Sequence, residues 1–426
     1  MFKVFKFGGA SVKDAAAIKN LKRILSEPSD ERLVIVVSAM GKTTNALEKI
    51  LEAARKQSPE FTPLFEALKV FHYQICNELF EDPPVSLTAQ LETLFQELHF
   101  QLSVSPDSIP YDEHYDQTVS FGELLATKIV SYYLIQEKLS LKLIDARAYL
   151  ITDHCYRAAS ISWPQTCSAI STLKGQTTEK MILTQGFIGK AENGKTTTLG
   201  REGSDFSAAI FAHCLDASEV VIWKDVPGLL NGDPKRFLET QKIDHISYSE
   251  AIELAFYGAT VIHPKTIKPL QNKGIPLKVQ SFNDPKLSPT LIDNNPDYDN
   301  VVPSFIIKDN QMLISISPRD FSFMSESNLQ EAFGIFHHLR IHANLIQASA
   351  ISLSICIDEN SERLEALIKS FREKYAVKYN SGLEMLTIRH YNEKLAAEAS
   401  KGREILLEQR SRITLQFVMK TIGETA

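Results

Sequence analysis

The N-terminal stretch constrains the fold of this chain more than any other feature. VFKFGG (Val4–Gly9) and LVIVVSAM (Leu33–Met40) are apolar runs bounded by glycine or polar residues, as the buried strands of parallel sheets are. Between them, KDAAAIKNLKRIL places its apolar residues at helical spacing. A strand, a helix and a second strand in this order predict a βαβ unit.

The alternation of strands and helices continues through the first two thirds of the chain. Further strands are predicted at Leu141–Ala146, Lys180–Gly189, Glu219–Val226 and Ile275–Phe282, with helical stretches between most of them. This order predicts an α/β sandwich on a mainly parallel sheet. Leu, Phe and Ile recur at helical spacing between about residues 45 and 110, so this region is expected to be a helical insertion that carries no chemistry.

The pattern changes after KLSPTLIDNNPDYD (Lys286–Asp299), a segment rich in Pro, Asn and Asp that is predicted to be a domain boundary. Beyond it, the order strand, helix, strand, strand, helix, strand predicts a βαββαβ unit. A second unit is predicted to begin at LEMLTIRH and to continue with a helix over Asn392–Gln409 and a strand at TLQFVMK. The sequence ends before two further strands and a helix, so the second unit is expected to be truncated.

Composition and charge exclude several classes of function. The net charge of −6 gives no electrostatic reason to expect a nucleic acid or an anionic membrane as a partner. No apolar run is long enough to cross a bilayer, and the N-terminus lacks the apolar stretch of a signal peptide. The five cysteines are scattered and form no CxxC pair, so we expect buried thiols and a cytoplasmic location.

Two loops at strand ends are candidates for binding phosphate. In KFGGAS (Lys6–Ser11), a strand ends in a lysine and turns through two glycines into a helix, whose free N–H groups favour an anion. The alternative is a glycine turn that only closes a tight connection between a strand and a helix. SAMGKTT (Ser38–Thr44) is similar to the end of a P-loop, but Val36 stands where that motif requires glycine, so only a Gly/Ser/Thr-rich loop remains.

Three further stretches carry charged residues that suit a site. Glu123 opens a helix in SFGELLATKI, where a carboxylate is most often only a favourable partner of the helix dipole. TTTLGREGSD (Thr196–Asp205) precedes a predicted helix and supplies a cation, a hydroxyl and a carboxylate at its start. IWKDVPGLLNGDPKR (Ile222–Arg236) runs from a strand into a turn-rich loop, which either holds a nucleotide or only connects two elements.

In this order and spacing, KFGGASV, SFGE, TLGREGSD, IWKDVPG and FYGATVIHP (Phe256–Pro264) resemble the signatures of the aspartate kinases of the amino-acid kinase family. The resemblance covers nearly the whole chain. It implies a three-layer kinase domain over residues 1–297 and two interlocked ACT domains, of ferredoxin-like α+β fold, over residues 298–426. The implied reaction transfers the γ-phosphoryl group of MgATP to the β-carboxylate of L-aspartate. Its product, 4-phospho-L-aspartate, leads to lysine, threonine, methionine and diaminopimelate.

The resemblance also assigns roles to residues. A carboxylate acceptor is ionised at pH 7, so the site must bring two anions together and needs no general base. Arg201 would bind the α-carboxylate of aspartate and Glu123 its ammonium, with Thr44 and Ser204 beside them. Lys6 and Asp205 would be catalytic, and Asp205 would orient Lys6 or help to place Mg²⁺. The implied ATP-binding residues are Lys6, Gly8, Gly9, Ser38, Lys224, Asp225, Leu230, Lys235 and Thr260.

The sequence departs from the family pattern at several of these positions. Glu202 stands where glycine is usual, and we expect its side chain either to face away from the ligand, which a negative φ would allow, or to pair with a nearby lysine. On the nucleotide side, Lys224 replaces a threonine, Leu230 a tyrosine and Lys235 an arginine. Thr260 stands where a phosphate-contacting lysine is common, so the cation gained at Lys224 is a hypothetical replacement for it.

The C-terminal region departs further from the family. Ser325 and Asn344 are predicted to belong to an effector site, but Asn344 and Ala350 stand where lysine-sensitive relatives carry acidic residues. An acidic residue there would bind the ammonium of the effector, so weak or absent inhibition by lysine is expected. A truncated sheet would leave strand edges unpaired, which fits a homodimer formed through the ACT domains.

Two other functions are open to such a sequence. The first is a related kinase that phosphorylates glutamate, acetylglutamate or a nucleoside monophosphate, although TLGREGSD, SFGE and the ACT region argue against it. The second is a regulatory ACT protein of weak or no activity, which the substitutions on the nucleotide side would support. Lys6, Arg201 and Asp205 argue against this second alternative.

Overall fold

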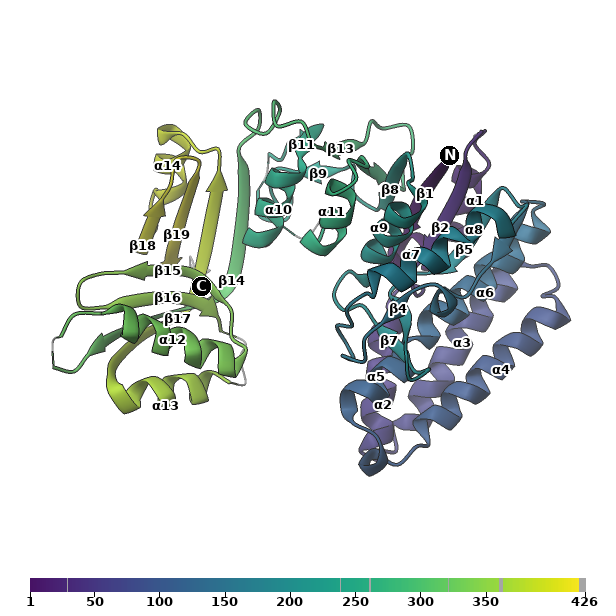
Figure 1. The fold of residues 1–426 in the computed structure, drawn as a ribbon, viewed down its shortest axis with the longest axis horizontal. Coiled ribbons are helices and arrows are strands. Elements are labelled where there is room, and N and C mark those ends of the chain that lie inside the picture. Colours follow the sequence, from purple (N-terminus) through teal and green to yellow (C-terminus); the bar gives the residue numbers. More distant parts are fainter. Residues whose placement is uncertain (29, 238, 260–261, 321, 360–362, 421–426) are drawn as a thin grey trace. The chain divides into compact units, whose positions relative to one another are not determined.

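The computed structural model of the protein describes residues 1–420 except 29, 238, 260–261, 321 and 360–362 (Figure 1). The chain divides into two compact units. Unit 1 comprises Met1–Leu229, Lys242–Ile252 and Thr260–Asp299, and unit 2 comprises Leu230–Gln241, Glu253–Ala259 and Asn300–Ala426. A functional division at residues 297–298 stays a prediction.

Unit 1 is built on a large, mainly parallel sheet. Its strands are β1 (Phe2–Phe7), β2 (Arg32–Val37), β3 (Leu141–Leu143), β5 (Met181–Gln185), β8 (Glu219–Lys224), β11 (His245–Ser247), β12 (Leu277–Ser281) and β13 (Thr290–Asp293). They lie in the order β11-β13-β12-β8-β1-β2-β5-β3, and β12 and β13 are an antiparallel pair. Leu33 to Val37 of β2 are all buried, as expected for a strand covered on both faces.

Helices supply most of the remaining residues of unit 1. They are η1 (Gly9–Val12), α1 (Ala15–Leu25), α2 (Thr43–Arg55), α3 (Phe61–Leu79), α4 (Val85–Leu102), η2 (Pro106–Ser108), α5 (Tyr111–Val119), α6 (Phe121–Gln136), η3 (Ala146–Ala148), α7 (Trp163–Ser171), α8 (Leu173–Gln176), α9 (Gly203–Leu215) and α11 (Pro264–Gln271). Both units contribute to α10 (Tyr248–Tyr257). Across the described residues, we find no helix with the length and apolar character that a bilayer crossing requires.

The two faces of the sheet carry different helices. Lys6 and Phe7 are neighbours on β1, so their side chains point to opposite faces. Lys6 contacts Asp205 of α9. Phe7 pairs with Val37 and Val37 pairs with Gln185, so the side chains of Phe7 and Gln185 point to the same face of the sheet. Gln185 donates a hydrogen bond to Thr127 of α6 at 2.8 Å. Because α9 and α6 cover opposite faces, the predicted three-layer α/β sandwich is confirmed.

One predicted strand of unit 1 is wrong. Lys180–Gly189 is not continuous, because β5 ends before Phe187 and β6 (Ile188–Ala191) begins after it. The φ of Phe187 is +67°, which a strand does not accommodate. β6 pairs instead with β4 (Ile151–Thr152) and β7 (Thr196–Thr198) in a separate three-stranded sheet.

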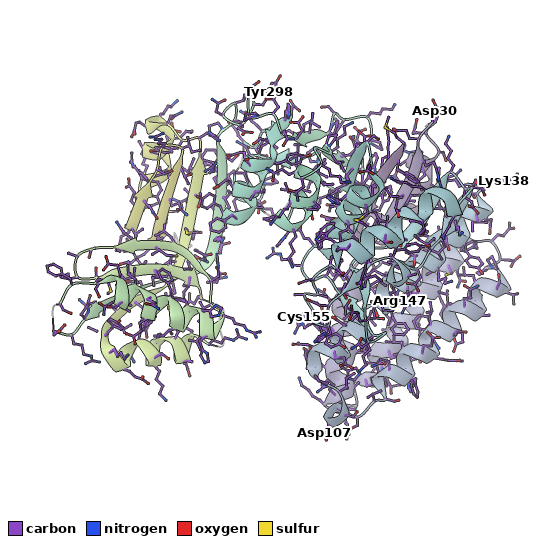
Figure 2. All side chains as sticks on the ribbon, viewed as in Figure 1. Asp30, Asp107, Lys138, Arg147, Cys155 and Tyr298 are labelled. Atoms are coloured by element: carbon purple, nitrogen blue, oxygen red, sulfur yellow. A yellow bond between two sulfur atoms is a disulfide. The ribbon has the colours of Figure 1, made fainter. Side chains whose placement is uncertain are left out.

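The cysteines of unit 1 also differ from expectation. Cys167 of α7 and Cys214 of α9 form a disulfide across 47 residues of sequence. Cys155 is exposed at the surface of unit 1 (Figure 2). The expectation of a buried thiol is therefore wrong for these three cysteines, whereas Cys76 and Cys356 are buried and free.

Unit 2 is an antiparallel sheet with helices on it. Its strands are β14 (Ser304–Pro318), β15 (Ala343–Ala348), β16 (Leu353–Asp358), β17 (Tyr375–Arg389), β18 (Ile405–Arg410) and β19 (Thr414–Lys420), and its helices are α12 (Glu326–Leu339), α13 (Leu364–Lys374) and α14 (Glu393–Ser400). The strand order is β15-β16-β14-β17-β19-β18. Two short strands, β9 (Leu229–Leu230) and β10 (Lys242–Ile243), complete the elements of the part of the chain that the structure describes.

The two long strands of unit 2, β14 and β17, each run through both halves of its sheet. Residues 304–308 of β14 pair with 385–389 of β17, whereas residues 311–318 pair with 375–383. Register shifts between residues 308 and 313, and positive φ values at Asn310 and Gly382, mark the change between the halves. α12 and α13 cover an apolar core that includes Ile314 and Ile355, and α14 contributes Ala396 to a second core around Phe417.

Two predictions about the second βαββαβ unit, which begins at LEMLTIRH, are wrong. The helix over Asn392–Gln409 is interrupted, because α14 ends at Ser400, Gly402 has a φ of +71°, and β18 follows. The strands expected to be missing are present, since β18 and the first part of β14 complete a group of four with β17 and β19. The first part of β14 precedes the inserted half in sequence, which is why the pattern of the C-terminus alone does not reveal it.

Candidate active site

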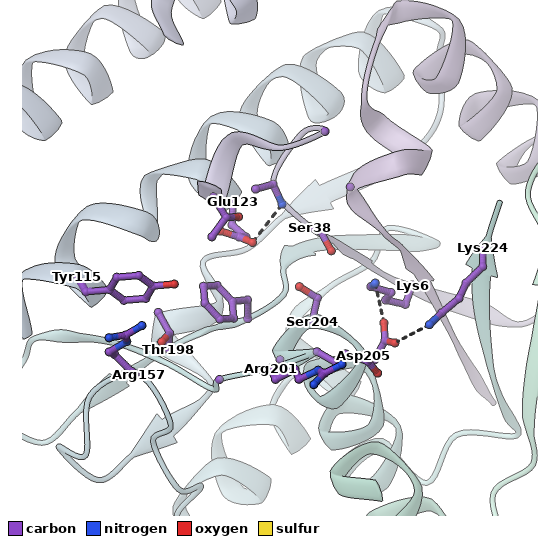
Figure 3. A pocket seen from close by; sticks show the side chains of 18 residues that line it. Lys6, Ser38, Tyr115, Glu123, Arg157, Thr198, Arg201, Ser204, Asp205 and Lys224 are labelled. Carbon is purple, nitrogen blue, oxygen red and sulfur yellow. Dashed lines mark hydrogen bonds and ion pairs between the residues drawn. The ribbon is translucent and has the colours of Figure 1, made fainter. Parts of the chain in front are cut away.

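A cavity of about 480 Å³ lies in unit 1, at the carboxyl ends of β1, β2 and β8 (Figure 3). Ligands of open α/β sheets bind at this edge, because loops and helix N-termini converge there. The predicted site residues that line the cavity are Lys6, Gly9, Ser38, Thr44, Glu123, Arg201, Ser204, Asp205 and Lys224.

The glycine turn after β1 is required by close backbone packing. A Cβ atom on Gly9 would lie 2.8 Å from the carbonyl oxygen of Gly41 and 3.0 Å from that of Ala39. A Cβ on Gly8 would lie 3.3 Å from Nζ of Lys6. The turn therefore brings two loops together beside the lysine, which fits the phosphate-binding interpretation of KFGGAS better than a simple connection.

A carboxylate held between two lysines forms one end of the cavity. Nζ of Lys6 lies 2.6 Å from Oδ1 of Asp205, and Nζ of Lys224 lies 3.5 Å from its Oδ2. Burial alone would raise the pKa of Asp205, but the positive charges of Lys6 and Lys224 outweigh it and hold that pKa below its ordinary value. The three groups together carry one net positive charge, and they point toward one another (Figure 3).

Glu123 is a buried carboxylate with spare capacity for hydrogen bonds. Only 2% of the residue is exposed, and its Oε1 accepts a hydrogen bond from the N–H of Ala39 at 3.1 Å. Its Oε2 is buried and has no hydrogen-bond partner among the described residues. Burial raises the pKa of Glu123 to about 8. This environment suits a carboxylate that receives a cation from a ligand better than one that only faces a helix dipole.

The loop before α9 and the first turn of that helix place Arg201 and Ser204 in the cavity wall. A Cβ on Gly186 would lie 2.6 Å from Cβ of Ser204, so the start of α9 packs tightly on the end of β5. Glu202 has a φ of +53°, its side chain also lines the cavity, and its Oε2 is buried without a described hydrogen-bond partner. The negative φ that was expected to allow an outward side chain is therefore wrong, and the direction of the Glu202 side chain relative to a ligand stays a prediction.

Several lining residues were not predicted from the sequence. Tyr115, Arg157, Phe187 and Thr198 contribute to the wall. Thr198 lies within TTTLGREGSD but was not singled out there, and none of the motifs considered in the sequence contains Tyr115 or Arg157. The signal that would have found Phe187 is the end of β5, because the carboxyl ends of parallel strands meet at this edge. The prediction of one long strand over Lys180–Gly189 hid that end.

Other predicted nucleotide-binding residues are not brought into the cavity. Asp225 is exposed, and Leu230 and Lys235 belong to unit 2. In unit 2, the neighbouring Arg236 forms ion pairs with Asp309 and Glu384. Gly8 lies next to the cavity, and Thr260 lies outside the described residues.

The two predicted effector residues lie in unit 2 and have structural partners there. Ser325 caps α12 in a capping box with Asn328. The side chain of Asn344 is buried, donates to Gln311 and Asp358, and accepts from Nζ of Lys308 at 2.9 Å. The hydrogen bonds of Asn344 are thus satisfied within the sheet, which leaves little capacity for an effector.

Comparison with known proteins identifies the class to which this arrangement belongs. The model of the amino acid kinase family matches residues 1–281. Lysine-sensitive aspartokinase 3 of Escherichia coli (strain K12) is 32% identical over 362 residues, which are 83% of this chain and 78% of that protein. The chain therefore belongs to the amino acid kinase family, and within it to the aspartokinases.

Solved structures agree with this assignment over the whole chain. The crystal structure of E. coli aspartokinase III in complex with aspartate and ADP matches with a TM-score of 0.84 and 26% identity, and covers 99% of this chain and 96% of that one. The complex of that enzyme with lysine and aspartate matches with a TM-score of 0.80 and 27% identity, and covers 98% and 95%. The predicted α+β organisation of the ACT region is thereby confirmed.

Proposed function

We propose that the chain is an ATP-dependent aspartate kinase, which transfers the γ-phosphoryl group of MgATP to the β-carboxylate of L-aspartate and releases 4-phospho-L-aspartate. The observation that carries the proposal is a single cavity in which Lys6, Asp205 and Lys224 lie with Arg201 and Glu123. A carboxylate acceptor and the phosphates of ATP repel each other, so a fixed positive charge must lie between them. Lys6 and Lys224 offer that charge in a position held by Asp205.

The acceptor would bind on the Glu123 side of the cavity. Its ammonium would donate to the unpartnered Oε2 of Glu123, and its α-carboxylate would bind the guanidinium of Arg201 through two hydrogen bonds. Thr44 and Ser204 would flank the amino acid. The β-carboxylate would then face Lys6, since it is the group that accepts phosphate.

The phosphates would bind on the Lys6 side, against Gly8, Gly9 and Ser38. The contact between Lys224 and Asp205 supports the hypothesis that Lys224 supplies a phosphate-binding cation, which the sequence lacks at position 260. For the base and ribose, Asp225, Leu230 and Lys235 stay predictions.

We propose that Mg²⁺ enters with the nucleotide rather than at a site built by the protein. Both carboxylate oxygens of Asp205 already face lysines, which does not fit the predicted role of this residue as a metal ligand. Among the described residues there is no cluster of three or more His, Cys, Asp or Glu side chains that could hold a metal ion. Mg²⁺ takes many of its ligands from phosphate oxygens and water, so MgATP is the substrate.

We also propose a homodimer formed through the ACT region. β15 is an edge strand of the sheet of unit 2, and Ile346 on it is 37% exposed. A second copy that covers this edge would pair its free backbone groups. Sedimentation of the full chain tests the proposal. A cytoplasmic location and a role at the start of lysine and threonine biosynthesis accompany the proposed reaction, and cell fractionation together with complementation of an auxotroph would test them.

The decisive experiment traps the product. Hydroxylamine converts an acyl phosphate into a coloured hydroxamate, so the full chain is assayed with MgATP and aspartate, glutamate or N-acetylglutamate. Colour with aspartate alone, lost in Arg201→Ala, is the expected result. Colour with another acceptor instead would reassign the substrate, and no colour with any of them would favour a regulatory protein of no activity.

A further inference from the structure

A buried carboxylate outside the predicted site ties two walls of the cavity together. Asp116 lies on α5, in the helical region that follows α4, and none of its surface is exposed. Its two oxygens accept from the N–H of Arg157 at 3.1 and 3.0 Å, and from the N–H and hydroxyl of Thr198 at 2.8 and 2.7 Å. Both partners line the cavity.

The segments that Asp116 joins lead directly to the predicted clamp for the acceptor. The N–H of Ala159 also donates to the carbonyl of Thr198 at 2.9 Å, so the segment that contains Arg157 lies along the end of β7. A Cβ on Gly200 would lie 3.0 Å from the carbonyl oxygen of Arg157. The backbone of Arg157 thus packs on the residue that precedes Arg201.

Arg157 itself is held in a conformation that a free chain would avoid. Its φ is +68°, and its guanidinium lies 4.4 Å from the ring centroid of Tyr115 and 3.4 Å from the carboxylate of Asp112. Hydrogen bonds to an ionised acceptor are about twice as strong as neutral ones, so the Asp116 carboxylate can hold this backbone in place. Burial raises the pKa of Asp116 to about 6, against the hydrogen bonds from Thr198 and Arg157, so the carboxylate is mostly ionised at pH 7.

We propose that Asp116 is a positioning residue for the acceptor. By fixing the Arg157 peptide and Thr198, it sets the place of Gly200 and hence of the Arg201 guanidinium that would bind the α-carboxylate. It does not touch the reacting atoms. The inference rests on the proposed function, and it adds to that site a residue of α5, which lies just beyond the helical insertion predicted over residues 45–110.

The test compares Asp116→Asn in the full chain with a matched control. Asp299→Asn removes a carboxylate that also accepts from a backbone N–H and a hydroxyl, both of Ser247 and both at 2.6 Å, in the same unit, and neither residue lines the cavity. The α-carboxylate keeps its charge through the reaction, so its clamp contributes equally to ground and transition states. We expect Asp116→Asn to raise KM for aspartate roughly tenfold or more, with kcat and KM for ATP changed less than about threefold, and Asp299→Asn to change none of them.

A measurement that needs no activity separates this proposal from the proposed function. Amide hydrogen exchange of residues 153–160 and 196–203 should become at least about tenfold faster in Asp116→Asn and stay unchanged in Asp299→Asn. Thr198→Val, which removes one of the hydrogen bonds, should give a smaller change in the same peptides, and it replaces Asp116→Asn if that variant does not fold. If wild type were inactive with every acceptor, the proposed function would fail while exchange still tested Asp116. Unchanged exchange in these segments, or an equal loss of kcat for all substrates, would overturn the positioning role.

Discussion

Under the proposed binding mode, in which Glu123 receives the ammonium of aspartate, binding should release a proton at pH 7. Burial raises the pKa of Glu123 to about 8, and only one of its oxygens has a described hydrogen-bond partner. At pH 7, one pH unit below this pKa, roughly ten molecules in eleven carry the proton. An ammonium beside Glu123 stabilises the charged form, so the complex holds the ionised carboxylate.

The pKa of Glu123 sets both the loss of aspartate affinity at pH 7 and the number of protons released. Ionising Glu123 at pH 7 costs about 1.4 kcal/mol, which weakens aspartate binding about elevenfold relative to a pH well above 8. Roughly 0.9 proton should leave on binding at pH 7 and about 0.5 at pH 8. Titration calorimetry at pH 7, in phosphate and in Tris, measures this release, since the two buffers differ in ionisation enthalpy.

Glu123→Gln is the matched variant. It keeps the shape of the side chain and removes both the charge and the proton, so its affinity for aspartate should be weak and should not change between pH 6.5 and 8.5. A release close to zero from wild type at pH 7, with aspartate still bound, would refute the assignment of Glu123 to the ammonium.

The same carboxyl predicts how stability changes with pH. Its pKa is raised from the ordinary value of 4.5, so between these values the folded chain binds more protons than the unfolded one. Stability from this group is therefore present at low pH and is lost as pH rises toward about 8. In thermal unfolding without ligand, Tm of wild type should fall relative to that of Glu123→Gln as pH goes from 5 to 8.

Three further results are expected. Lys224→Thr should raise KM for ATP several-fold, because it removes a cation beside Asp205, and an unchanged KM in the steady-state assay would end its phosphate-binding role. Glu202→Gly should stabilise the protein by about 1 kcal/mol in thermal unfolding, since glycine adopts a φ of +53° without strain, and a loss of stability would show that the buried carboxylate has a stabilising partner. Lysine at millimolar concentration should leave activity nearly unchanged, because Asn344 is neutral and its side chain is occupied by Gln311, Asp358 and Lys308; strong inhibition would contradict this.

Residues at the ends of strands could be located from the sequence. Lys6, Ser38 and Lys224 follow or end apolar runs, and parallel strands bring their carboxyl ends to one edge, so proximity followed from local pattern alone. Arg201 and Asp205 were found in the same way from the loop that opens a helix.

Residues that meet through tertiary packing could not be located. Asp116 reaches Arg157 and Thr198 across 41 and 82 positions of sequence, and no local pattern encodes such a contact. The direction of the Glu202 side chain depends on the φ of this residue, and the amino-acid type at one position does not determine φ. The half of the unit 2 sheet that contains β18 and β19 was predicted wrongly for a similar reason. Its first strand, residues 304–308 of β14, precedes in sequence the whole of the other half.

Because β14 and β17 run through both halves of the unit 2 sheet, they show where such a protein can gain or lose one half. Residues 304–308 and 385–389 pair as neighbouring antiparallel strands, so the chain leaves this half of the sheet and re-enters it at adjacent points. The segment between them carries its own apolar core under α12 and α13. A piece of chain that starts and finishes at adjacent points of a host sheet can be exchanged as a unit, so the half of unit 2 that carries α12 and α13 could be replaced by grafting without redesigning the rest of the sheet.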